Sequence, residues 1–152
     1  MAKPECVLRL AGSYRQFHDY LSHRHGVECA KIHEKYGILK YQMAFNTTST
    51  RTLAESMKLP YPVSSHDMEI EYYFRDVAAL LAVSADADFK RLHVECEPYV
   101  DLAATSVTLT WIEVYLEDGR LVNVDKEGKS AQPSFQELAD IGVAEGPVAK
   151  YY

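Results

Sequence analysis

Two stretches of the chain alternate apolar with polar side chains, which is the period-two pattern of a strand that buries one face. This pattern predicts strands at Ile38–Phe45 and at Asp67–Phe74. The residues on the apolar sides of these two strands are Leu39, Tyr41, Met43 and Phe45, and Met68, Ile70, Tyr72 and Phe74. We expect each strand to present two different faces, one to a core and one away from it.

Two more strands are predicted toward the ends of the chain. Apolar residues indicate a first strand at Cys6–Leu10 and a fourth at Ser106–Leu116. The fourth turns at Asp118-Gly119, a dipeptide typical of tight hairpins, into a short return strand at Arg120–Val124.

A helix is predicted between the first two strands. Ser13, followed three residues later by Gln16, forms a capping box that marks its start. The apolar stripe that follows is interrupted at Gly26, where we expect the helix to break or bend. It then resumes and ends at Tyr36, with Gly37 as its C-cap.

Three later segments carry weaker helical patterns. Thr47–Met57 predicts a short helix, and Asp76 is placed to cap a second main helix that runs through Val83. The segment Asp86–Asp101 is helical in pieces, broken before Pro98.

The order of these elements is β-α-β followed by β-α-β, which predicts an α+β, ferredoxin-like fold with a mainly antiparallel sheet. Helices would cover one face of this sheet. The other face would still carry large residues, with Trp111 and Tyr115 or their even-numbered neighbours among them. Because such a face is too apolar for water, we expect it to line a ligand cavity or to meet a second copy of the chain.

The net charge, the length of the apolar runs and the cysteine spacing limit which kinds of partner the protein can bind. A net charge of -6 argues against nucleic acid, which requires a basic face, and no apolar run is long enough to span a membrane. The three cysteines are far apart and lack CxxC spacing, which is typical of reduced thiols in a cytoplasmic protein. We therefore expect a cytoplasmic protein whose main partner is neither nucleic acid nor a membrane.

Residues 13–26 contain three of the six histidines. On a regular helix, His18 and His25 lie two turns apart on nearly the same face, about 10 Å from each other along the axis. That separation is too large for one metal ion, but the two rings could flank an aromatic substrate. His23 would be rotated away from both, so we expect no metal site here.

The same stretch resembles the first-helix signature of EthD-domain proteins, a branch of the dimeric α/β-barrel superfamily, and fungal members are the most similar. The motifs that carry the resemblance are Ser13-x-x-x-Phe17-His18-x-Tyr20-x-x-x-x-His25-Gly26, Tyr36-Gly37-Ile38-Leu39-x-Tyr41, Phe74-Arg75-Asp76-Val77, Asp88-Phe89 and Trp111-x-Glu113-Val114-Tyr115 followed by Asp118-Gly119. In this chain only Ala11-Gly12 separates the first strand from the helix, whereas family members have a longer connection.

The resemblance implies a domain at residues 5–125 and leaves 126–152 as a C-terminal extension, with one helical turn predicted at 135–138. It also implies a homodimer in which two sheets pack face to face and each subunit encloses a cavity. Fungal relatives act in polyketide pathways, where assigned activities include decarboxylation of anthraquinone-type acids. Related barrels include cyclases, isomerases and monooxygenases that use no cofactor.

His25 is the leading catalytic candidate, because it occupies the histidine position of the signature and a glycine follows it. A structural alternative is a helix histidine that bonds a nearby carbonyl. His18, Tyr41 and Tyr72 complete the expected catalytic set, in which tyrosine hydroxyls would hold an enolate oxygen. The expected substrate-binding residues are Tyr20, Tyr73, Trp111 and Glu113. Tyrosine is also a common core residue, and Glu113 acts as an acid or base only if its strand face lines the cavity.

No glycine-rich phosphate loop and no nucleophile elbow is present, so we expect no cofactor and a reaction run by proton transfer. The resemblance makes a lyase that decarboxylates an aromatic or polyketide-derived acid the leading expectation. Dehydration or cyclisation, and oxygenation of an anthrone-like phenol, are alternatives. A non-catalytic binding barrel is an alternative from a different class.

Overall fold

The structure is a computed structural model that describes residues 2–8 and 14–134. The predicted Ser13 cap, the Ala11-Gly12 connection and the helical turn at 135–138 lie outside the described residues. The chain divides into a large compact unit, residues 2–110, and a second unit that begins at Trp111. Each unit is described by itself.

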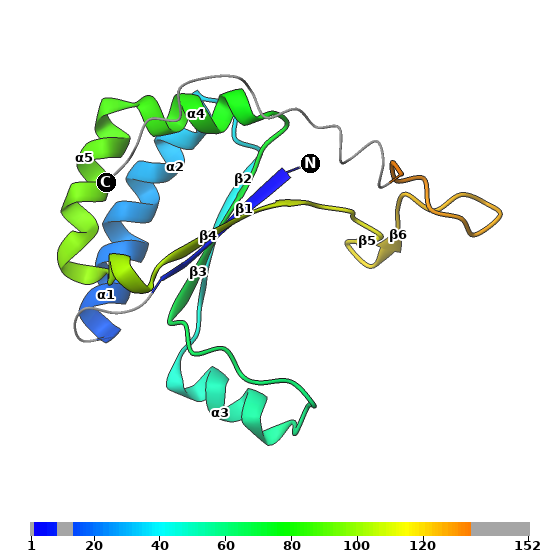
Figure 1. Cartoon of the computed structure of the whole chain (residues 1–152), viewed down its shortest axis with the longest axis horizontal. Helices are drawn as coiled ribbons and strands as arrows, with labels where there is room; N and C mark the ends of the chain where they lie inside the picture. The colour runs from blue at the N-terminus through cyan, green and yellow to red at the C-terminus, as the bar shows by residue number, and fades with distance from the viewer. Residues whose placement is uncertain (1, 9–13, 135–152) are drawn as a thin grey trace. The chain divides into compact units, whose positions relative to one another are not determined.

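A four-stranded sheet forms the centre of the large unit, with the order β2-β3-β1-β4 (Figure 1). Its strands are β1 (Ala2–Leu8), β2 (Lys40–Phe45), β3 (Met68–Tyr73) and β4 (Ser106–Trp111). β3 pairs antiparallel with both β1 and β2. The four predicted strands are confirmed, but β1 begins before Cys6 and β4 ends at Trp111 instead of Leu116.

The register of β2 and β3 places their apolar residues on one face. Tyr41 lies opposite Tyr72, and Met43 lies opposite Ile70. The polar residues between them share the other face, where the Gln42 amide and the Tyr73 hydroxyl both donate to the Glu71 carboxylate. This second face is therefore polar along β2 and β3, in contrast to the expected apolar surface.

One long helix follows β1, in three consecutive segments: α1 (Tyr14–Tyr20), a π-helical segment η1 (Leu21–His25) and α2 (Gly26–Lys35). The predicted break at Gly26 is wrong, because Gly26 has helical backbone angles, φ -61° and ψ -39°, and its N–H bonds the carbonyl of Leu21 five residues earlier. Gly37, at φ +73°, follows the end of the helix as predicted.

Gly26 is required by close packing. A Cβ atom at this position would lie 2.5 Å from Cε of Met43 on β2 and 2.9 Å from the carbonyl oxygen of Leu21. The glycine therefore brings the helix close to the sheet at the end of the π-helical segment.

Three further helices are described. α3 (Thr48–Ser56) is capped by Thr47, α4 (Val77–Ala85) by Asp76 as predicted, and α5 (Ala87–Cys96) by Asp86. Short 3-10 turns follow at Glu97–Tyr99, where Pro98 lies, and at Leu102–Ala104. Figure 1 shows α1, α2, α4 and α5 on one side of the sheet, while α3 stands apart beyond the ends of β2 and β3.

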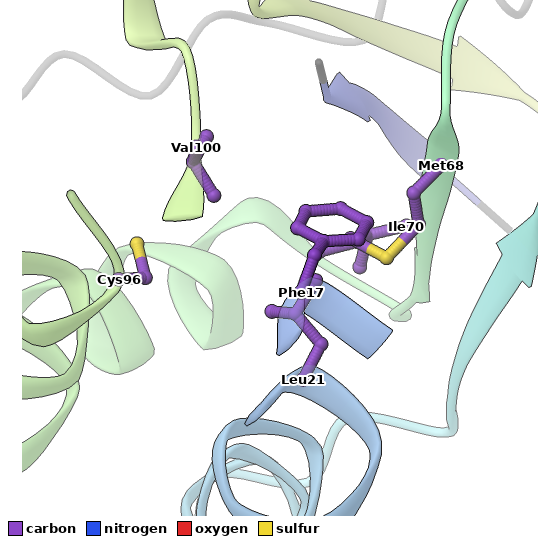
Figure 2. Packing of buried hydrophobic residues seen from close by; sticks show 6 residues of the cluster. All are labelled: Phe17, Leu21, Met68, Ile70, Cys96 and Val100. Carbon is purple, nitrogen blue, oxygen red and sulfur yellow. The ribbon is translucent and has the colours of Figure 1, made fainter. Parts of the chain in front are cut away.

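The main core lies between the long helix and β3. Phe17 and Leu21 pack beside Met68 and Ile70 of β3 (Figure 2). Cys96 and Val100, at the end of α5 and just after it, complete this buried cluster. The helix and the sheet are thus held at a fixed spacing near η1, where the histidine-rich stretch lies.

The second unit contains a hairpin, β5 (Leu116–Glu117) and β6 (Arg120–Leu121). Its turn residues Asp118 and Gly119 both have positive φ, 49° and 75°, as a two-residue type I′ turn requires. The predicted turn is confirmed. In the part of the chain that the structure describes, no helix is long and apolar enough to cross a membrane.

Candidate functional site

The π-helical segment decides which side chains of the histidine-rich stretch meet. Its hydrogen bonds span five residues instead of four, so residues five apart come together. The rings of Tyr20 and His25 are 5.9 Å apart, and those of His18 and His23 are 6.3 Å apart. The expectation that His23 is rotated away from His18 is therefore wrong, and the ring beside His25 is that of Tyr20.

His25 is buried, with 4% of its surface exposed. Its Nε2 lies 3.3 Å from the Cys29 sulfur, whereas Nδ1 is buried and has no hydrogen-bond partner among the described residues. Burial, assisted by the nearby His93 and His33, lowers the pKa of His25 to about 4. The imidazole is therefore neutral at physiological pH and can accept a proton.

Tyr20 lies beside His25 and is half-buried. Its ring stacks flat on Tyr99 of the first 3-10 turn, with 4.2 Å between the centroids. Its hydroxyl is buried without a hydrogen-bond partner in the described ranges. Burial raises the pKa of Tyr20 to about 12, and the neighbouring Cys96 and Glu95 act in the same direction. The phenol therefore keeps its proton and can donate it.

An open groove of about 520 Å³ runs past Tyr20 and Tyr99. Its other lining residues are Gln16, Asp19, Arg24 and Pro98. The Arg24 guanidinium pairs with the Glu95 carboxylate at 2.9 Å and is largely exposed. Arginine binds carboxylates in a two-pronged geometry, so Arg24 is placed to hold an acidic ligand in this groove.

The Tyr20 hydroxyl oxygen and His25 Nδ1 are among the buried polar atoms that have no hydrogen-bond partner in the described ranges. A buried polar group without a partner costs about 1–3 kcal/mol, and native proteins leave few of them. A polar ligand that reaches both atoms would recover this cost. The rings of Tyr20 and His25 lie side by side, and they supply a neutral acid and a neutral base. Such a pair can move a proton from one atom of a substrate to another.

A separate aromatic stack holds the two tyrosines expected to be catalytic. His33 of α2 lies flat over Tyr41 and Tyr72, with centroid distances of 4.7 Å and 4.8 Å. Burial raises the pKa of the Cys29 thiol to about 12, opposed in part by a hydrogen bond with Tyr41. Sequence reasoning missed His33. The spacing of His25, Cys29 and His33, four residues apart each time, could have placed all three on one helix face.

The remaining candidates lie elsewhere. The half-buried His18 ring packs on Phe45, 4.7 Å between centroids, and its Nε2 lies 3.2 Å from the Ser22 hydroxyl. Tyr73 lies on the polar face of the sheet, with Glu71. Trp111 and Glu113 belong to the second unit, where Glu113 accepts a 2.5 Å bond from the Tyr115 hydroxyl. No group of three or more metal-ligating side chains is found within 14–134 or β1.

Comparison with known proteins identifies the family. The model of the EthD domain matches residues 12–103, which include the long helix, the aromatic stack and the Tyr20–His25 pair. The chain belongs to the EthD domain family. The resemblance found in the helix signature is thereby confirmed.

Curated EthD-type relatives are fungal. A protein named "Putative oxygenase" from Aspergillus terreus is 31% identical over 78% of this chain and 76% of its own length. A "Conidial pigment biosynthesis dehydratase EthD" from Metarhizium robertsii is 24% identical over 70% of this chain and 77% of its own. "Decarboxylase nsrE" from Aspergillus novofumigatus is 25% identical over 78% and 81%.

Among solved structures, HapK from Hahella chejuensis superposes with a TM-score of 0.53 at 10% identity, covering 77% of this chain and 99% of HapK. This similarity concerns the fold alone. It confirms the expected α+β, ferredoxin-like fold class. The domain boundary at residue 125 and the homodimer stay predictions.

Proposed function

We propose that this EthD-domain protein is a lyase that removes water from an aromatic or polyketide-derived substrate, with His25 as general base and Tyr20 as general acid. The observation that carries the proposal is the Tyr20–His25 pair. Both groups are in the protonation state that the reaction needs, and each has a buried polar atom without a partner among the described residues.

The reaction follows from these two groups. In the tautomer that directs the Nε2 proton at the Cys29 sulfur, which the proposal requires, Nδ1 of His25 keeps a lone pair and removes a proton from the carbon next to a substrate carbonyl. The hydroxyl on the following carbon takes a proton from Tyr20 and leaves as water, and a carbon–carbon double bond forms. The His25 imidazolium then returns its proton to the Tyr20 phenolate, which restores both residues.

Cys29 is a positioning residue in this scheme. Its thiol is protonated because burial raises its pKa to about 12, so the sulfur is no nucleophile at neutral pH. Its contact with His25 Nε2 at 3.3 Å fixes the orientation of the imidazole. Arg24 would hold an acidic group of the substrate at the mouth of the groove.

Decarboxylation is the second candidate, supported by the relative named as a decarboxylase. In that reaction the carbon left by carbon dioxide needs a proton, and a histidine with a pKa of about 4 carries none at neutral pH. The proton would come from Tyr20, and His25 would have no role as a base. The pair therefore supports elimination of water more directly.

Three probes separate the candidate reactions. Loss of water converts 3-hydroxy-1-tetralone to fluorescent 1-naphthol, loss of carbon dioxide converts 1-hydroxy-2-naphthoic acid to the same product, and oxygenation converts anthrone to a quinone with uptake of oxygen. We expect turnover of the tetralone, and a loss of at least about 100-fold in kcat for His25→Asn and for Tyr20→Phe. Turnover within a few-fold of wild type in both variants would refute the acid–base pair, and release of carbon dioxide alone would select decarboxylation.

A further inference from the structure

A second groove lies farther along the long helix, beside α2. It runs between α2 and the start of β2, which lie side by side at the edge of the sheet (Figure 1). Its volume of about 570 Å³ is in the range of small-molecule sites. None of its lining residues lines the groove beside Tyr20.

Apolar side chains form part of the lining of this groove. Val27 and Ala30 contribute from α2, and Ile38 and Leu39 from the segment that enters β2. Val27 and Leu39 are each nearly half exposed, 47% and 46%. Two apolar side chains held at the mouth of a concave surface favour a ligand with an apolar body.

His33 also lines this groove, together with the charged side chains of Lys31, Glu34 and Lys40. Only 2% of His33 is exposed. Nδ1 bonds the backbone carbonyl of Cys29, and because a carbonyl only accepts, Nδ1 must carry the proton. Nε2 is therefore a bare lone pair, buried and without a hydrogen-bond partner among residues 14–134.

The imidazole is held rigidly in this orientation. It is stacked on Tyr41 and Tyr72, and the edge of Phe89 packs against it at 5.7 Å between centroids. Burial lowers the pKa of His33, so the lone pair stays available at neutral pH. A fixed acceptor of this kind selects a ligand that brings a proton to donate.

We infer that the groove between α2 and β2 is a second small-molecule site, which binds a hydroxylated aromatic compound through a hydrogen bond from its hydroxyl to His33 Nε2. The apolar walls receive the rings of the ligand. Lys31 and Lys40, whose side chains are long and flexible, line the same groove and can move aside to admit it. The inference is independent of the reaction proposed at His25.

The test uses the full chain labelled with ¹⁵N at histidine, and two probes of similar shape. 2-Naphthol has a hydroxyl proton to donate, whereas 2-methoxynaphthalene has none. We expect 2-naphthol to shift the Nε2 resonance of His33 in a saturable way, in the direction of a lone pair that accepts a hydrogen bond. The methyl ether should bind at least about tenfold more weakly. Equal binding of both probes, or a His33 resonance that does not move, would overturn the inference.

Substitutions of His33 test the same hydrogen bond independently of the two probes. His33→Asn keeps a donor toward the Cys29 carbonyl but removes the acceptor at the Nε2 position, so 2-naphthol affinity should fall about tenfold. His33→Gln, with an amide oxygen near that position, should recover part of it. His66→Asn, in the loop before β3, is the matched histidine removal and should bind as wild type does.

Wild-type affinity in His33→Asn would place the ligand elsewhere and refute the site. If either variant fails to fold, the comparison of the two probes on the wild-type protein decides alone. The same spectra also contain the ring nitrogen resonances of His25. A 2-naphthol shift at His25 without one at His33 would refute the second site and leave the proposed lyase reaction untouched.

Discussion

At the scale of single residues, the burial of His25 has a consequence for stability. Its pKa is about 4 in the folded protein, against 6.5 ordinarily, so the unfolded chain binds this proton more tightly. The stabilisation is fully present above pH 6.5 and is lost as the pH falls from there toward 4. Linkage gives a loss of about 2 kcal/mol between pH 7 and pH 5.

Urea unfolding at these two pH values checks this prediction. His25→Asn lacks the titrating group, so its free energy of unfolding should fall by about 2 kcal/mol less than that of wild type between pH 7 and pH 5. The exposed His23→Asn should behave as wild type. An equal pH dependence in wild type and His25→Asn would show that His25 is not held neutral.

The same pKa predicts the pH profile of the proposed reaction. Because the free enzyme keeps His25 neutral down to about pH 4, kcat/KM should stay flat through pH 6 and fall only near pH 4 to 5. Replacing Cys29 by Ala removes the sulfur beside Nε2 of His25. This substitution should shift the acidic limb of the profile, which is the pH range in which kcat/KM falls. The pH profile distinguishes a positioning role of Cys29 from simple packing, because packing alone would change the rate without moving the limb.

At the scale of elements, Gly26 ends the π-helical segment and lies close to Met43 of β2. In Gly26→Ala the new methyl group meets the end of the Met43 side chain, which can move, and the Leu21 carbonyl, which belongs to the backbone. We expect a loss of about 1–3 kcal/mol in the free energy of unfolding. Without such contacts, alanine in a helix would instead gain up to about 1 kcal/mol.

Two companion variants calibrate this prediction. Ala30→Gly, at an exposed position of α2, measures the helix propensity difference alone. Met43→Ala, alone and combined with Gly26→Ala, measures how much of the loss comes from the methionine. A stabilised Gly26→Ala would contradict the close approach of helix and sheet.

The same element shows where sequence reasoning stops. The strands at 40–45 and 68–73 were predictable, because a period of two places Tyr41 opposite Tyr72 on a single buried face. The π-helical segment was not, because no local pattern marks it, and the close approach of Gly26 to Met43 joins residues far apart along the chain. This segment brings the ring of Tyr20 beside that of His25, so the proposed catalytic pair differs from the set expected from the sequence. The hairpin turn at Asp118-Gly119, by contrast, was predictable, because these two residues by themselves favour the positive φ angles that the turn requires.

At the scale of the whole molecule, the homodimer expected from the sequence has a candidate surface on β4. Val107 and Leu109 are exposed by 69% and 56%, on a strand at the edge of the sheet. Exposed apolar residues at alternate positions of one strand are unusual on a monomer's surface and typical of an interface. We therefore expect the chain to be a dimer in solution that uses this strand.

Sedimentation at micromolar concentration tests the dimer directly. Wild type should sediment as a dimer, and Val107→Glu combined with Leu109→Lys should sediment as a folded monomer, because each charge would lose its hydration in the interface. Leu53→Lys on α3, an equally exposed apolar position, is the matched control and should stay dimeric. A wild-type monomer, or a double variant that remains dimeric, would exclude β4 as the interface. If the monomeric variant keeps turnover of the tetralone probe, the Tyr20–His25 pair acts within one subunit, since both residues come from the same helix.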